Sequence, residues 1–209
     1  MKLDNLMNTV FETKALENAS NIEKLKELVS ENVTLDNVSS WLRDLKESQD
    51  SESIGSLASL MEQHPLGFEK YVIWKSETNG SRVRLHYWPQ TKWPMESIHD
   101  HRFHFCAKVL KGYYIHEEYD VKNLEGDSVE VYLKKKEIIN AGDTYFFPAG
   151  SFHRVTPSEE MTVSLIVRGE PVLPYSRVIN PDTLKMRKAY GALQKFQSKI
   201  ANLEAQLTN

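Results

Sequence analysis

The sequence predicts a mainly β protein: one antiparallel barrel or sandwich over residues 67–180, with helices before and after it. Three observations lead to this prediction. Residues 1–66 carry Leu at helical spacings and almost no Gly or Pro. Residues from about 68 to 180 form short runs rich in β-branched and aromatic residues, separated by Gly, Asn, Asp and Pro. In residues 181–209 apolar positions again recur every three or four residues.

Size and charge limit the classes of function. A chain of 209 residues is long enough for one well-filled core and short for two catalytic domains. The 26 Lys and Arg nearly balance the 29 Asp and Glu, so we expect neither a nucleic acid nor a membrane surface as partner. The single cysteine, Cys106, cannot form an internal disulfide, and the N-terminus lacks an apolar signal segment. A cytoplasmic protein is expected.

The N-terminal segment, 1–66, reads as helices that pack on the barrel. Ile22, Leu25 and Val29 lie near helical spacing, and Trp41 and Leu45 continue the pattern in the next helix. Residues 48–53 resemble a linker, after which a third helix is expected over 54–63. The strands of the barrel, 67–180, are expected within 69–77, 81–90, 97–119, 127–139, 143–150 and 162–169.

The C-terminal segment, 181–209, is predicted to be one amphipathic helix. Its apolar residues are Met186, Tyr190, Leu193, Phe196, Ile200, Leu203 and Leu207. Packing of this stripe against the barrel is favoured over a coiled-coil seam between two copies. A homodimer remains possible through the stripe.

The stretch "SIHDHRFHFC", residues 97–106, contains the strongest chemical signal. Side chains alternate faces along a strand, so His99 and His101 project to the same side, as two ligands of one ion must. A third imidazole is available at His153, which follows the Pro-Ala-Gly sequence 148–150. These histidines predict a metal site rather than three unrelated surface or core residues.

The same motifs resemble those of the cupin superfamily. "HDH" followed by "GDTYFFPAGSFH", residues 142–153, is similar to the two cupin motifs. The resemblance implies a double-stranded β-helix, or jelly roll, that holds a divalent metal through His99, His101 and His153. Where most cupins place a glutamate ligand, this chain has Phe105 and Cys106. Three neutral imidazoles suit Fe(II), and they also suit Zn, Ni or Mn, so ligand type alone leaves the ion open.

Within the cupins, the chain resembles the cysteine dioxygenases, which are thiol dioxygenases. The shared features are "NG" at 79–80, Trp88, a Cys at 106, "HRV" at 153–155 and "VSL" at 163–165. The chain also departs from that family. Ile73 stands where the resemblance places a carboxylate-binding Arg. Of the family's Ser-His-Tyr relay only Ser164 is present, with Ile166 and Arg168 at the other two positions.

The predicted catalytic residues are therefore Arg168, Cys106 and Ser164. Arg168 could hold an anionic group of a substrate, or it could be an ordinary ion-paired Arg at the barrel rim. Cys106 could be functional or simply buried. Arg82, Arg84 and His86 alternate along one strand face, and the pattern leaves open whether that face is the barrel interior.

The leading hypothesis is a mononuclear Fe(II) oxygenase that uses O₂ on a small anionic or amino-acid-like molecule other than free cysteine. One alternative is a redox-neutral isomerase or lyase whose metal acts as a Lewis acid. Another is a ligand-binding protein without catalytic activity.

Overall fold

The computed structural model describes residues 1–63, 68–89 and 96–207. The helices are α1 (Leu3–Glu12), α2 (Ala15–Asn18), α3 (Ile22–Asn32), α4 (Leu35–Glu47), α5 (Ser51–Ala58) and α6 (Ala192–Leu207). The first strands are β1 (Glu62–Gln63), β2 (Glu69–Lys75), β3 (Arg82–Trp88), β4 (Ile98–His99), β5 (Phe105–Lys111) and β6 (Tyr113–Asn123). They are followed by β7 (Val129–Asn140), β8 (Thr144–Phe147), β9 (Phe152–Pro157), β10 (Thr162–Arg168), β11 (Tyr175–Ile179) and β12 (Met186–Tyr190).

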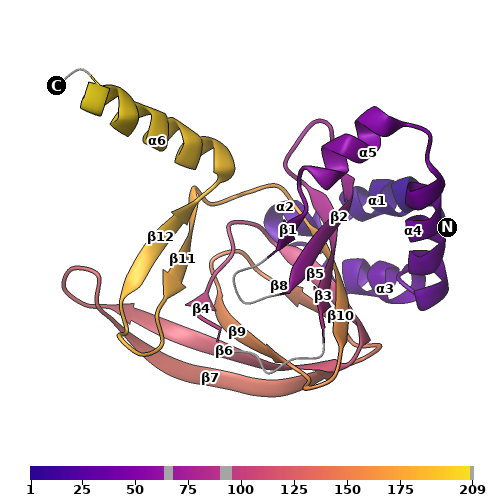
Figure 1. The fold of residues 1–209 in the computed structure, drawn as a ribbon. Helices are drawn as coiled ribbons and strands as arrows, with labels where there is room; N and C mark the ends of the chain where they lie inside the picture. The colour runs from indigo at the N-terminus through magenta and orange to yellow at the C-terminus, as the bar shows by residue number, and fades with distance from the viewer. Residues whose placement is uncertain (64–67, 90–95, 208–209) are drawn as a thin grey trace.

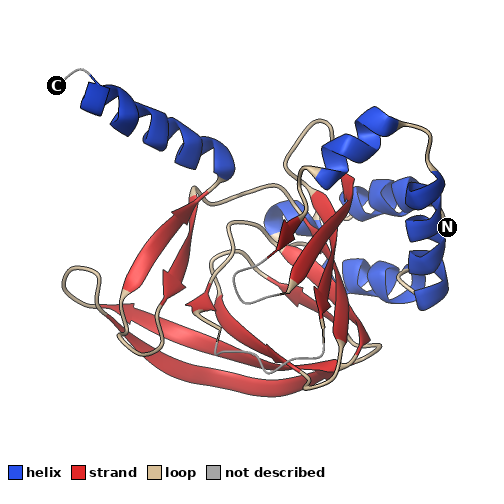
Figure 2. Ribbon diagram, in the orientation of Figure 1, coloured by secondary structure: helices blue, strands red, loops and turns tan. Residues whose placement is uncertain are grey.

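The strands form two antiparallel sheets (Figure 2). One sheet has the order β1-β2-β3-β10-β5-β8 and the other has the order β12-β11-β4-β9-β6-β7. Between β3 and β11 the chain passes repeatedly from one sheet to the other, as in a jelly roll. The predicted mainly β fold with helices at both ends is confirmed. The predicted boundary between residues 66 and 67 lies outside the described residues.

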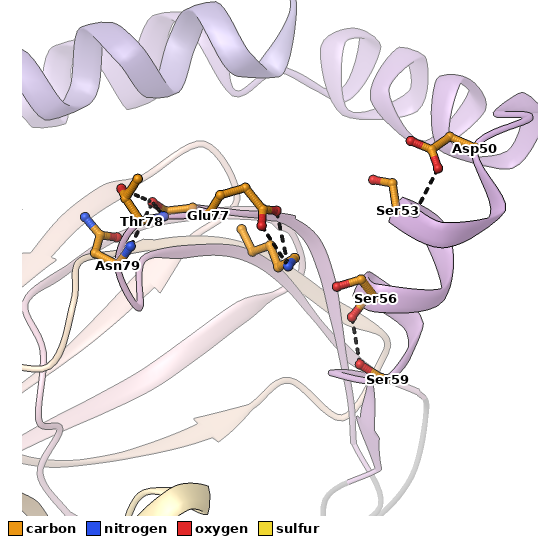
Figure 3. A network of polar contacts seen from close by, with 9 residues as sticks. Asp50, Ser53, Ser56, Ser59, Glu77, Thr78 and Asn79 are labelled. Carbon is orange, nitrogen blue, oxygen red and sulfur yellow. Dashed lines mark hydrogen bonds and ion pairs between the residues drawn. The ribbon is translucent and has the colours of Figure 1, made fainter.

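The N-terminal helices begin where the sequence supplies caps. The Thr34 hydroxyl accepts a hydrogen bond from the Asn37 backbone N–H at the start of α4, and the Asp50 carboxylate accepts one from Ser53 at the start of α5. Figure 3 shows the second cap beside the turn that joins β2 to β3. Because Asp50 caps a helix, α5 begins inside the stretch expected to be a linker and ends at Ala58, before the predicted end.

Helices α1–α5 gather on one side of the molecule (Figure 1), where α3 and α4 contact the first sheet. Alternate residues of its central strands, such as Val83, Leu85, Leu165 and Val167, are buried in one cluster with apolar residues of the helices. The residues between them therefore point toward the second sheet. On β3 the polar residues Arg82, Arg84 and His86 alternate with the buried Val83 and Leu85, so this strand turns its polar face to the second sheet.

The C-terminal segment differs from its prediction. Met186 and Tyr190 lie on strand β12, which pairs with β11, and the helix begins only at Ala192. Residues four apart share a face on a helix and on a strand alike, so the spacing of these two residues could not tell the two structures apart.

Helix α6 projects away from the two sheets (Figure 1), and all of its residues are exposed. The predicted packing of its apolar stripe on the barrel is therefore wrong. No helix among the described residues is both long and apolar enough to span a membrane.

Candidate metal centre

Three imidazoles from separate segments converge between the sheets. His99 on β4 lies directly opposite His153 on β9, and His101 follows shortly after β4. The ring centroids of the three histidines are 4.8–5.0 Å apart, and the Nε2 atoms of His101 and His153 are 2.8 Å apart. Their ligand atoms all lie within 4.8 Å of one another, which suits a shared ion.

A buried ion pair holds the two histidine-bearing segments together. Asp100, between the two histidines in the sequence, is 1 % exposed. Its carboxylate accepts hydrogen bonds from the backbone N–H and the Nε of Arg177, the latter at 2.6 Å. The Nη2 of Arg177 donates to the carbonyl of Gly150 at 2.9 Å, and the Gly150 N–H donates to the carbonyl of His101. The turn before His153 is thereby fixed relative to His101.

Hydrogen bonds also select which nitrogen each imidazole presents. The Nδ1 of His99 lies 3.0 Å from the carbonyl of Ser97, which can only accept, so Nδ1 carries the proton and Nε2 is available to a metal. The Nδ1 of His153 lies 2.9 Å from the Nε2 of His116, which leaves its own Nε2 facing His101. Burial lowers the pKa of His101 and His153 well below the usual value, so both are neutral, as imidazole ligands must be. This donor set fits a divalent transition metal.

The site opens into a cavity of about 460 Å³ between the sheets, lined by both polar and aromatic side chains. Its lining includes the three histidines and four cationic residues, Lys70, Arg84, Arg168 and Arg187. Arg84 and His86 thus face the interior, which settles the open question for these two residues. Arg82 shares their strand face but does not line the cavity.

Two of the guanidinium groups that line this cavity, those of Arg84 and Arg168, have few partners. Arg168 is 4 % exposed; its group lies over the Phe103 ring at 4.3 Å, and Nη1 makes a long hydrogen bond of 3.4 Å to the Gly169 carbonyl. Among the described residues, the Nε atoms of Arg168 and Arg84 have no hydrogen-bond partner, and neither group forms a salt bridge. Burial, followed by the charges of neighbouring Arg residues, lowers the pKa of both. An anion in the cavity would relieve this cost.

Two acidic residues line the cavity, and neither neutralises these arginines. Asp100 is occupied by Arg177. Glu96 accepts a long hydrogen bond of 3.3 Å from the Val155 N–H, and burial raises its pKa, which favours the neutral carboxylic acid. The positive charge of the cavity therefore remains available to a ligand.

The other predicted catalytic residues differ in position. Ser164 lines the cavity, where its hydroxyl lies 2.9 Å from the hydroxyl of Tyr114. Cys106 does not line the cavity. It packs in the cluster beneath the N-terminal helices, and burial raises the pKa of its thiol to about 12. The Cys106 thiol thus lies on the helix side of the sheet, away from the three histidines. Its strand neighbours Phe105 and Ala107 face the opposite way.

Sequence reasoning missed His116 and Tyr114, which lie on β6 and contact site residues across strands. His116 is 2 % exposed and hydrogen-bonded to His153. Their local sequence, "YYIHEEY", shows only an alternating strand. The signal that would have identified His116 is its pairing with β9, which the sequence does not display.

Comparisons with known proteins give similarity at the level of the fold. No family model matches the chain, and no curated protein matches it. A cupin superfamily protein from Desulfitobacterium hafniense DCB-2 is similar in structure with 13% sequence identity over 54% of this chain and 85% of that chain, at a TM-score of 0.33. An RmlC-like cupin protein from Ralstonia eutropha JMP134 is 12% identical over 61% of this chain and 72% of that chain, with a TM-score of 0.40.

A third similar structure is KdgF from Halomonas sp., which is 12% identical over 53% of this chain and 88% of that chain, with a TM-score of 0.36. Identities and TM-scores this low carry no information on substrate or activity. Two of these similar structures are described as cupin proteins.

Proposed function

We propose that this chain is a metal-dependent oxygenase that binds one divalent ion, Fe(II), through His99, His101 and His153 and oxidises a small anionic substrate with O₂. The observation that carries the proposal is the juxtaposition of two groups in one cavity. Three imidazoles gather there, and two buried guanidinium groups lack anionic partners among the described residues. A bound Fe(II) ion would supply the redox-active centre for reaction with O₂, and the oxidised substrate would supply the electrons.

The residues of the chain bind and orient the substrate. Arg168 and Arg84 lie on adjacent strands, with Ile166 opposite Arg84 and Arg168 two residues further along. Together they can hold a carboxylate or a similar group by bidentate hydrogen bonds. Phe103 and Phe105 line the same cavity and exclude water from the reacting atoms.

The proposed substrate differs from that of the cysteine dioxygenases that the chain resembles. Ile73 occupies the position of their carboxylate-binding Arg, and it packs with the N-terminal helices instead of lining the cavity. The anionic group would therefore be held on the β3–β10 side by Arg84 and Arg168. We expect free cysteine to be a poor substrate, since the anchor lies elsewhere.

The test is oxygen uptake by protein of defined metal content. Metal-free chain is loaded anaerobically with Fe(II), Mn(II), Ni(II) or Zn(II), and bound metal is measured by elemental analysis. Small thiols, amino acids and carboxylic acids are then added in an oxygen electrode. We expect one ion per chain and O₂ consumption with the Fe(II) form in the presence of an anionic compound. Turnover without O₂ uptake would contradict the oxygenase proposal and indicate a redox-neutral lyase or isomerase. Tight binding of a compound without turnover would indicate a ligand-binding protein.

A further inference from the structure

We propose that His116 and Glu137 are positioning residues that fix the tautomer of His153 for metal binding. This inference rests on the metal-binding part of the proposed function and does not depend on which reaction follows. The two residues lie directly opposite each other on the neighbouring strands β6 and β7. They extend the candidate metal centre from the cavity toward the surface.

The contacts form a chain of three side chains. The Nδ1 of His153 is 2.9 Å from the Nε2 of His116, and the Nδ1 of His116 is 3.7 Å from a carboxylate oxygen of Glu137. His116 is 2 % exposed, and among the described residues its Nδ1 has no hydrogen-bond partner. The Glu137 carboxylate lies within ion-pair distance of this buried nitrogen, close enough to accept a hydrogen bond after a small movement.

The positions of the imidazole protons determine in which direction the hydrogen bonds from His153 through His116 to Glu137 run. If Nε2 of neutral His153 binds a metal, its proton must sit on Nδ1, which donates to Nε2 of His116. Neutral His116 then carries its own proton on Nδ1, where it faces the Glu137 carboxylate. In the opposite arrangement, His116 donates to His153 and the proton of His153 lies on Nε2, which blocks metal binding. Glu137 favours the first arrangement.

The same count argues against a second ion in the neighbourhood. The ligand atoms of His116, Glu118 and Glu137 also lie within 4.8 Å of one another. An ion there would need the lone pair of His116 Nδ1, so neutral His116 would donate from Nε2, and the first site would lose His153. Lys135, at 2.7 Å from Glu137, already supplies a positive charge to the acidic residues. These contacts therefore favour a single metal at His99, His101 and His153, with His116 and Glu137 hydrogen-bonded behind His153 as a relay.

The test compares variants that keep or remove the acceptor for His153. His116→Leu removes it, whereas the amide oxygen of His116→Gln can still accept from Nδ1–H. Zn(II) affinity is measured by competition with a chelator, alongside the melting temperature. We expect His116→Leu to weaken binding about 10–100-fold, with partial rescue in His116→Gln and an intermediate loss in Glu137→Gln. Glu118→Gln is the matched control. It removes a nearby charge that is not part of the His153–His116–Glu137 hydrogen bonds, so this variant should bind Zn(II) with wild-type affinity.

A spectroscopic measurement separates tautomer selection from a packing role. In ¹⁵N-histidine NMR of the Zn(II)-loaded protein, His153 should be protonated on Nδ1 and His116 on Nδ1. Unchanged Zn(II) affinity in folded His116→Leu, or a His116 proton on Nε2 in the loaded protein, would overturn the relay and leave metal binding intact. Wild-type protein that binds no ion would instead overturn the proposed function and the relay together.

A separate observation leads us to propose that α6 pairs in parallel with α6 of a second copy of this chain. Its apolar residues follow a heptad spacing and are all exposed: Leu193, Phe196, Ile200, Leu203 and Leu207. With Leu193 at position a, the other a residues are Ile200 and Leu207, and the d residues are Phe196 and Leu203. The central pair, Ile200 at a and Leu203 at d, is the combination that favours two-stranded parallel coiled coils. An isolated helix of 16 residues is marginal in water, so burial of this stripe would stabilise it.

Charge complementarity selects the parallel arrangement. In this heptad Lys199 occupies position g and Glu204 occupies position e, five residues later. In a parallel pair, g of one helix lies beside the following e of the other, so symmetry gives two Lys199–Glu204 contacts. In an antiparallel pair, g faces g and e faces e, and neither contact forms.

Sedimentation of the full chain tests this pairing. We expect wild type to reach twice its 24.1 kDa mass and Ile200→Glu to raise the dimer dissociation constant at least about tenfold. Ser198→Glu, on the outward position f, is the matched control and should stay dimeric. Lys199→Glu should weaken the dimer, and addition of Glu204→Lys should restore it. A monomeric wild type, or an Ile200→Glu variant that dimerises normally, would overturn the pairing.

Discussion

Replacing His101 with Ala is expected to abolish stoichiometric metal binding. Apparent binding energies of about 10–16 kcal/mol for four-ligand structural zinc sites correspond to roughly 3 kcal/mol for each ligand. Loss of one of three imidazoles should therefore weaken binding on the order of 100-fold or more. The rings of Phe103, Phe105 and Phe147 lie beside His101 and offer no ligand atom in its place. The measurement is Zn(II) and Fe(II) content after dialysis, with circular dichroism to confirm the fold.

The control for this experiment is His104→Gln. His104 lies near the site in sequence but does not line the cavity, and its Nδ1 accepts a hydrogen bond from the Ala149 N–H at 3.0 Å. The amide oxygen of Gln can accept the same bond, so metal content should be unchanged. Equal metal content in His101→Ala and wild type would show that the ion, if any, is held elsewhere.

Replacing Arg168 with Ala is expected to weaken the binding of an anionic substrate by ~2–4 kcal/mol, or about 30–1000-fold. The guanidinium is buried without an anionic partner among the described residues, so it is prepared for a negative charge that the chain does not supply. The effect should appear in KM, or in the dissociation constant of the anion measured by calorimetry on the metal-loaded protein. Metal content should not change, because Arg168 is not a ligand.

Two comparisons make this prediction specific. Arg82→Ala removes a positive charge directly opposite Arg168 but outside the cavity lining, and should alter anion binding much less. Arg168→Met keeps much of the side-chain volume and removes a poorly compensated buried charge, so the melting temperature should rise while anion binding falls. Undiminished anion binding in Arg168→Ala would show that Arg168 is not the anchor.

The strand pattern predicted the fold class, but it could not decide which face of a strand meets the cavity. Cys106 shows why. On β5 both faces are apolar, because one is covered by helices and the other by the aromatic side of the cavity. Alternation of hydrophobic and polar residues, which assigns faces in a half-exposed sheet, is therefore absent.

The helical segments show a similar limit. Capping residues and Leu spacing are local signals, and they predicted helices in the N-terminal segment, with errors at the ends of α5. The apolar spacing of α6 was equally visible. This spacing identifies the apolar face of α6, but it does not show which surface covers that face. The prediction that the barrel covers it was wrong, because these residues are exposed.

The sequence by itself determined the local features of this protein: a mainly β architecture between helices, two imidazoles two residues apart, and a third after a Pro-Ala-Gly turn. Only the tertiary structure decided which distant side chains meet these imidazoles. His116 reaches His153, Arg177 ties Asp100 to Gly150, and Arg84 and Arg168 turn inward, each through pairing of strands far apart in the chain. Such contacts depend on register between strands, where a shift of one residue reverses the face of every side chain.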